Sequence, residues 1–163
     1  MIFWYKNKNN KMEIKTITFD TIIRTYQPYV DAAKSIENDK AEHLKKMEDF
    51  KSKMQSIYNS TQNLVLDDKT KNDKMEEFAK IQNEAQQLDN NFRTSLANNQ
   101  NEIMKNIYSD VNQIVKDYSI QNSIDLVISD TEIVYQNDGL NITNDIVEIV
   151  KSKGLYTPEL LKQ

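Results

Sequence analysis

The sequence predicts a mostly helical α+β protein, in which a long antiparallel coiled-coil hairpin of residues 29–121 is joined to a small β-rich body. The stretch from Pro28 to Gln121 holds no glycine, and Pro28 is its only proline. Apolar residues in this stretch recur at steps of three and four, which is the period of coiled-coil helices. Short runs rich in β-branched residues flank the stretch on both sides, as is typical of strands.

Composition excludes several classes of function. The 163 residues carry a net charge of −4, so nucleic acid, which needs a basic surface, is not expected as a partner. The chain has no cysteine and one histidine, His43, which leaves out thiolate metal sites and most catalytic motifs. We therefore expect no enzyme activity, no cofactor and no metal, and we interpret His43 as a surface residue because charged residues surround it. No apolar run is long enough to span a membrane.

Residues 1–12 are interpreted as an N-terminal leader. Its apolar part, Ile2–Tyr5, comes before its lysines, whereas a secretory signal begins with positive charge and continues with a longer apolar run. No export signal is therefore visible. Two interpretations of Trp4 stay open: it belongs to a frayed leader, or it is an aromatic anchor that contacts a neighbouring subunit or a partner protein.

The first part of the body is expected to contain one strand and one short helix. Ile14–Phe19 is rich in β-branched residues, and this composition predicts a strand. Asp20 is suited to cap a short helix. Pro28 ends this helix, because the residue before a proline leaves the helical region, and it fits the first turn of the next helix.

The hairpin is expected to bury one narrow apolar stripe on each helix. We place a break between the helices near residues 59–68, where Asp67 or Asp68 can cap the returning helix. An apolar tripeptide at this tip either closes the end of the hairpin or forms an exposed contact patch for a client or partner; it consists of Leu64, Val65 and Leu66. The residues expected in the seam between the two helices are Leu44, Met47, Met54, Phe78, Leu88 and Phe92.

The second part of the body, residues 122–153, is expected to hold a β-hairpin and a helix. Ile124–Ile128 and Ile133–Tyr135 are predicted strands, and Gly139 is expected to supply a positive φ in the turn that follows. Thr143 is predicted to cap an amphipathic helix that ends before Gly154. Residues 154–163 form a tail, with a short terminal helix predicted after Thr157.

Three short strands and two small helices make a thin core, so we expect other copies of the chain to complete the body. The apolar residues expected in this shared body are Ile14, Ile17, Phe19, Leu126, Ile128, Ile133 and Tyr135.

In this order, the motifs resemble the Skp/OmpH family of periplasmic chaperones. The resemblance covers about residues 13 to 152. It is carried by the long charged hairpin and by five shorter pieces: Ile14–Asp20, the pair Tyr26 and Pro28, Asp125–Ile128, Ile133–Tyr135 and Leu140–Asn144.

The resemblance implies a homotrimer whose β-rich body carries three helical arms around a cavity. The family holds unfolded outer-membrane proteins in that cavity without ATP, and it has no active site. By resemblance, this chain is a periplasmic ATP-independent holdase or assembly chaperone for client proteins.

Two departures from the family keep an alternative open. No export signal is visible, and residues 31–70 carry seven lysines against eight acidic residues, whereas the arms of well-known members are basic. The alternative is a structural or scaffolding coiled-coil trimer that uses the same fold in the cytoplasm or in a virus particle.

Overall fold

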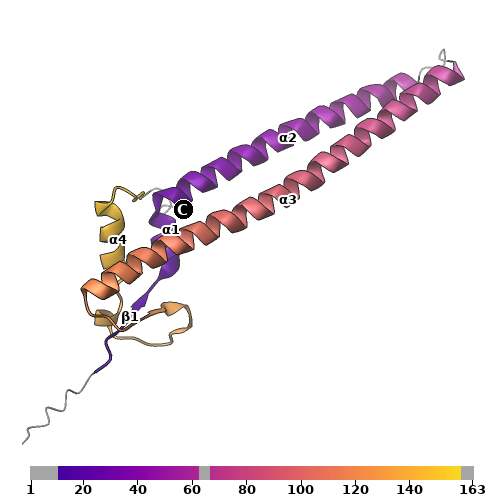
Figure 1. The fold of residues 1–163 in the computed structure, drawn as a ribbon. Coiled ribbons are helices and arrows are strands. Elements are labelled where there is room, and N and C mark those ends of the chain that lie inside the picture. Colours follow the sequence, from indigo (N-terminus) through magenta and orange to yellow (C-terminus); the bar gives the residue numbers. More distant parts are fainter. Residues whose placement is uncertain (1–10, 63–66, 159–163) are drawn as a thin grey trace, which may run out of the picture. The chain divides into compact units, whose positions relative to one another are not determined.

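The computed structural model describes residues 11–62 and 67–158, and these form a mostly helical α+β fold with a long helical hairpin, as predicted (Figure 1). In chain order the elements are β1 (Ile14–Ile17), α1 (Phe19–Thr25), α2 (Gln27–Thr61), α3 (Asp68–Gln121), β2 (Leu126–Ser129), the 3-10 helices η1 (Asp130–Glu132) and η2 (Asp138–Leu140), and α4 (Thr143–Ser152). They divide into two units. We call residues 31–103 the arm, and the described residues up to 30 and from 104 onward the body.

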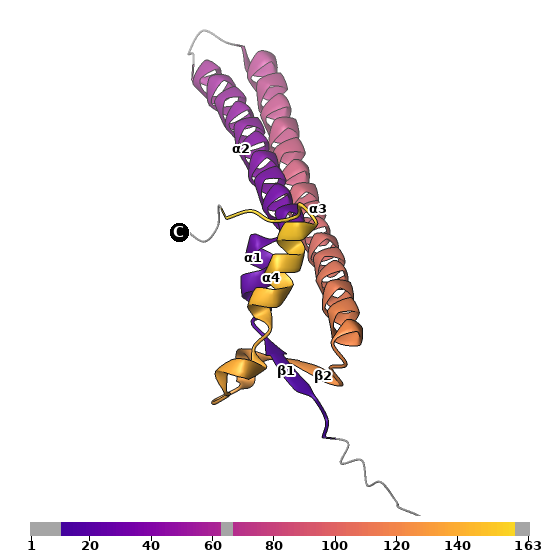
Figure 2. The ribbon, with the colours of Figure 1, turned by 90° about the vertical axis from the view of Figure 1, so that its left-hand side faces the viewer.

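The arm consists of two antiparallel helices. The parts of α2 and α3 within residues 31–103 run side by side in both ribbon views (Figures 1 and 2). Helix α3 has the predicted cap, because the Asp67 carboxylate accepts hydrogen bonds from the Thr70 backbone N–H at 2.8 Å and from its hydroxyl at 2.9 Å. The expected tip residues Leu64, Val65 and Leu66 lie outside the described residues, as does Trp4.

The sheet of the body has two parallel strands instead of the predicted three. Ile14 pairs with Leu126 and Ile17 pairs with Ser129. The predicted β-hairpin is wrong, because η1 follows β2 directly and turns the chain away from the strand. Residues 133–135 then run as a loop in which Val134 and Tyr135 are exposed. Ile133, Val134 and Tyr135 are residue types that favour strands, but in the structure β2 pairs with β1 and not with this segment.

The core of the body forms where α1, α4 and the body part of α3 pack together. Helices α1 and α4 lie side by side (Figure 2). Ile22 of α1, Val111 of α3, and Ile146 and Val150 of α4 are all fully buried. Each of these helices buries one apolar stripe against the others, and in this way the few elements of the body form a core.

Several local expectations change in the structure. Asp20 does not cap α1, which begins at Phe19; its carboxylate instead pairs with Arg24 at 2.7 Å. The helix α4 begins at Thr143, and the side chain of Asn141 accepts the Thr143 N–H at 2.8 Å. The Thr143 hydroxyl accepts the backbone N–H of Thr18 at 2.8 Å, so it ties the end of β1 to the start of α4.

The two glycines have different roles. Gly139 lies in η2 and does not have the positive φ that the sequence predicts there. Gly154 has a φ of +69° directly after α4, where a glycine is expected. The Gly154 N–H bonds to the Lys151 carbonyl at 2.9 Å, and the Leu155 N–H bonds to the Val150 carbonyl at 3.0 Å. This pair of bonds is the Schellman arrangement that ends a helix.

Candidate interaction surfaces

Within residues 11–62 and 67–158, no group of three or more acidic, histidine or cysteine side chains is placed to hold a metal ion. None of the helices in the described part of the chain is both long and apolar enough to cross a membrane. Three surfaces of the described residues are candidates for binding a partner: the seam of the arm, its flank, and an apolar face of the body.

The seam of the arm is thin. Among the described residues 31–62 and 67–103, three side chains are buried, namely His43, Ile57 and Ala85. Five of the six residues expected in the seam are half-buried: Met47, Met54, Phe78, Leu88 and Phe92. The two helices thus touch along a narrow line, and most of their surface meets water.

Leu44 does not belong to the seam, contrary to expectation, because its side chain is 68% exposed. His43 takes this place and is 9% exposed, so its interpretation as a surface residue is wrong. The seam continues from His43 through Met47 and Phe50 with steps of four and three. The expected stripe therefore differs from the observed one at this single turn of α2, where the charged neighbours of His43 favoured Leu44.

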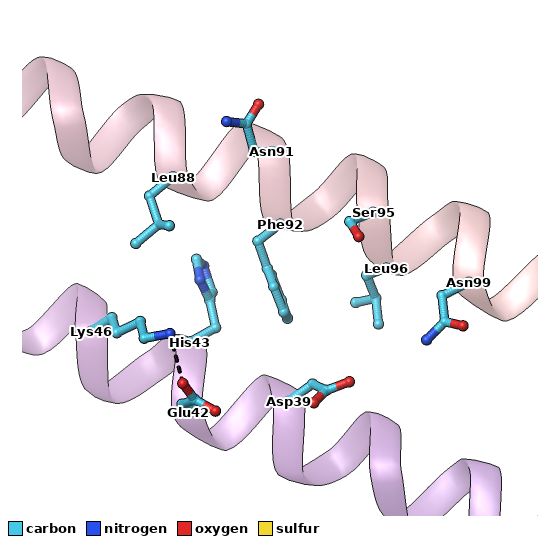
Figure 3. Close-up of a pocket in the computed structure, with 10 residues that line it drawn as sticks. All are labelled: Asp39, Glu42, His43, Lys46, Leu88, Asn91, Phe92, Ser95, Leu96 and Asn99. Atoms are coloured by element: carbon cyan, nitrogen blue, oxygen red, sulfur yellow. Dashed lines mark ion pairs between the residues drawn. The ribbon is translucent and has the colours of Figure 1, made fainter.

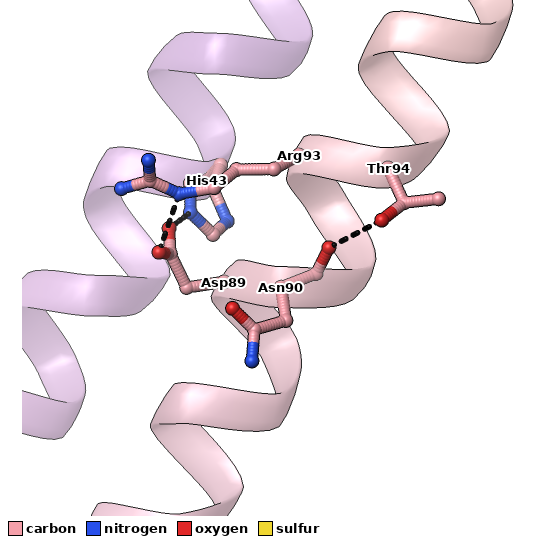
Figure 4. A network of polar contacts seen from close by, with 5 residues as sticks. All are labelled: His43, Asp89, Asn90, Arg93 and Thr94. Atoms are coloured by element: carbon pink, nitrogen blue, oxygen red, sulfur yellow. Dashed lines mark hydrogen bonds and ion pairs between the residues drawn. The ribbon is translucent and has the colours of Figure 1, made fainter.

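A polar network fixes His43 in the seam (Figure 4). Nε2 of His43 lies 2.9 Å from Oδ1 of Asp89, and Nε of Arg93 donates to Oδ2 of the same carboxylate at 2.7 Å. The hydrogen bonds from His43 and then from Arg93 hold the pKa of Asp89 below its ordinary value. The His43 ring also stacks on Phe92, with centroids 3.9 Å apart and planes inclined by 9°. Sequence reasoning missed this network because the charged neighbours of His43 hid its place on the stripe.

A groove of about 390 Å³ lies beside this network, between α2 and α3 of the arm (Figure 3). Apolar side chains of α3 line its floor: Leu88, Phe92 and Leu96. Its walls are polar and are formed by Asp39, Glu42, Lys46, Asn91, Ser95 and Asn99.

The body leaves apolar strand residues uncovered. Leu126 and Ile128 of β2 are 43% and 42% exposed, and Tyr135 is exposed in the loop that follows. Ile14, which pairs with Leu126, is exposed at the same end of the sheet. The other expected residues of a shared body differ: Ile17 is buried within the single chain, Phe19 stacks on Tyr108 with centroids 5.0 Å apart, and Ile133 is half-buried.

Comparisons with known proteins give one family and one similar fold. The OmpH family model, described as "Outer membrane protein (OmpH-like)", matches residues 13–150. A crystal structure from Caulobacter crescentus CB15, described as a proposed outer membrane chaperone (OmpH-like), matches with a TM-score of 0.78 and 6% identity over 94% of this chain and 92% of that chain. At this sequence identity the match shows a similar fold and nothing about function. A search of curated proteins finds no match.

Proposed function

This chain belongs to the OmpH-like family, and on that basis we propose that it is a chaperone, an ATP-independent holdase that binds unfolded or assembling client proteins between helical arms. The observation that carries the proposal is the thin seam of the arm, in which three of the described side chains are buried. Elements with few buried apolar contacts open at low free-energy cost. An arm of this kind can adapt its shape to clients that differ.

The composition of the seam supports adaptable binding. Met47 and Met54 are half-buried in the single chain, as are Phe50 and Phe78. Methionine is unbranched and polarizable, so it can repack against many apolar surfaces. When α2 and α3 separate or bend, these side chains offer apolar area to a client, and the burial of that area supplies the binding energy.

The body supports an assembly of several copies. Leu126, Ile128 and Tyr135 expose apolar area that a second copy would cover. We propose that the assembly is a homotrimer, so that three arms surround one client. Three weak contacts of this kind, held on one body, act together with a raised effective concentration.

An aggregation assay tests the holdase. A chemically unfolded client is diluted into buffer without nucleotide, and light scattering is followed with increasing amounts of the protein. We expect substoichiometric trimer to slow the rise in scattering, while an equal mass of an unrelated protein of the same net charge does not. Scattering that rises equally fast in both samples would contradict the proposal.

The near balance of charge on the arm favours a second candidate, a structural or scaffolding trimer. Residues 31–70 carry seven lysines and eight acidic residues, so this part of the arm lacks a strong net charge that would attract oppositely charged clients. Fractionation distinguishes the two: a permanent one-to-one association with a single assembly favours the scaffold, whereas exchange among many clients favours the holdase.

A further inference from the structure

Contacts between α2 and α3 position the floor of the arm groove. Phe92 stacks on His43, and Nε2 of His43 lies 2.9 Å from Asp89, which also pairs with Arg93. His43 covers one face of the Phe92 ring, while Leu96 and Asp39 lie on the side of the other face (Figure 3). The other face of the ring therefore borders the groove, and the stacking on His43 orients the ring without a ligand.

The spacing of the apolar residues on the floor is close to the spacing of side chains in an extended polypeptide. Leu88, Phe92 and Leu96 are four residues apart on α3, and four residues of helix rise by about 6 Å. An extended polypeptide places alternate side chains on one side about 6.7 Å apart. An extended segment lying along α3 can therefore set successive inward side chains close to successive floor residues.

One wall of the groove suits the backbone of such a segment. Asn91, Ser95 and Asn99 line the groove from α3, and all three are exposed. Amide and hydroxyl side chains both donate and accept hydrogen bonds. They can pair with backbone N–H and C=O groups of a client whatever its sequence.

The opposite wall, formed by α2, favours a positively charged side chain in the ligand. Glu42 pairs with Lys46 at 2.6 Å, but Asp39 is exposed and has no ion pair among the described residues. Its carboxylate lies on the same side of the Phe92 ring as Leu96 (Figure 3). A cation between this carboxylate and the ring would gain both an ion pair and a cation–π contact.

We propose that this groove binds an extended client segment in which apolar residues alternate and in which one lysine or arginine faces Asp39. The inference rests on the proposed holdase function and names the client feature that the arm selects. It also explains how an arm without net positive charge can hold a client, because the carboxylate of Asp39 attracts a basic side chain.

Labelled synthetic peptides test the groove on the full-length protein. The first peptide alternates apolar residues and threonine and carries one lysine; the second has glutamate in place of the lysine; the third has the composition of the first with its apolar residues clustered. Fluorescence anisotropy should show that the first peptide binds more tightly than both others. Asp39→Lys should weaken the binding of the first peptide by about tenfold. It should also reduce or reverse the difference in affinity between the lysine peptide and the glutamate peptide.

Glu37→Lys is the matched control, because it makes the same charge change at an exposed site of α2 that does not line the groove. It should leave the lysine preference in place. Since the chain has no cysteine, a solvent-sensitive dye on Ser95→Cys reports occupation of the groove directly. The inference is overturned if Asp39→Lys and Glu37→Lys act alike, or if the lysine and glutamate peptides bind equally.

The aggregation assay separates this inference from the proposed function. If the wild type slows aggregation while its peptide binding ignores Asp39, the holdase stands and the groove fails. If the wild type does not slow aggregation but the lysine preference depends on Asp39, the groove stands as a peptide site and the holdase fails.

Discussion

At the scale of single residues, the seam of the arm depends on a histidine in a position where coiled coils usually place an apolar residue. His43 fills this position through its stacking on Phe92 and its hydrogen bond to Asp89. A polar residue in a seam costs stability but sets the register of the two helices. His43 therefore helps to define which residues of α2 and α3 face each other.

His43→Ala should lower the free energy of unfolding of the arm by about 1–3 kcal/mol, because it removes a buried ring and one hydrogen bond. Urea unfolding followed by circular dichroism measures this change. Leu44→Ala is the control, and we expect it to change stability by less than about 0.5 kcal/mol because its side chain is 68% exposed. Equal losses in the two variants would return Leu44 to the seam.

Tyr26 should make stability sensitive to alkaline pH. Burial, and then the carboxylate of Asp110, raise the pKa of Tyr26 above its ordinary value of about 10. The folded-state pKa is the higher one, so the stability that this group contributes is intact below the ordinary pKa and is lost as pH rises through the folded pKa. Urea midpoints measured between pH 8 and pH 11 should therefore fall, and Tyr26→Phe should reduce that fall.

The spectrum of tyrosinate gives an independent check. In the wild type, part of the absorbance rise should be delayed to high pH, and Tyr26→Phe should remove some of that delayed part. The matched control is Tyr58→Phe, which removes the hydroxyl of an exposed tyrosine of the arm. A delayed component that survives Tyr26→Phe unchanged would assign it to another residue.

At the scale of secondary-structure elements, the end of α4 shows how one backbone angle decides the use of a glycine. An added Cβ would have no heavy atom within 4 Å at either Gly139 or Gly154. The two sites differ in φ, which is +69° at Gly154 and not positive at Gly139. Steric space is therefore equal, and the backbone conformation is the variable.

Gly154→Ala should destabilise the body by about 1 kcal/mol, because an alanine at positive φ is strained. Gly139→Ala should be neutral or should stabilise by about 0.4–1 kcal/mol, because it reduces the freedom of the unfolded chain. Thermal unfolding of both variants beside the wild type measures the difference. The same loss at both positions would mean that Gly139 has the strained turn that its sequence context suggests.

The elements that sequence could predict are those fixed by local pattern. The long helices follow from the regular spacing of apolar residues over residues 28–121, which contain no glycine and only one proline, Pro28. The cap of α3 follows from Asp67 at the break between the helices. Strand pairing depends on residues more than a hundred positions apart, as in Ile14 with Leu126. The strand-favouring residues at 133–135 therefore could not show that β2 pairs with β1 instead. The groove of the arm depends on which residues of α2 face Phe92, and the choice of Leu44 in place of His43 left this contact out of the prediction.

At the scale of the whole molecule, the uncovered apolar strand residues of the body make assembly the central question. A single chain buries Ile17 but leaves Leu126 and Ile128 more than two-fifths exposed. The burial of apolar area at about 25 cal/mol per Å² drives association when a matching surface is present. A symmetric trimer supplies that surface from identical copies.

Ile128→Asp should break the assembly, because it places a charge where another copy would bury an apolar side chain. Size exclusion with light scattering should give three times 19.1 kDa for the wild type and a smaller mass for the variant. Leu44→Asp is the control, since it adds the same charge at an exposed apolar site of the arm and should leave the mass unchanged. A wild type that elutes as one folded chain at low concentration would contradict the trimer, and it would remove the means by which three thin arms act on one client.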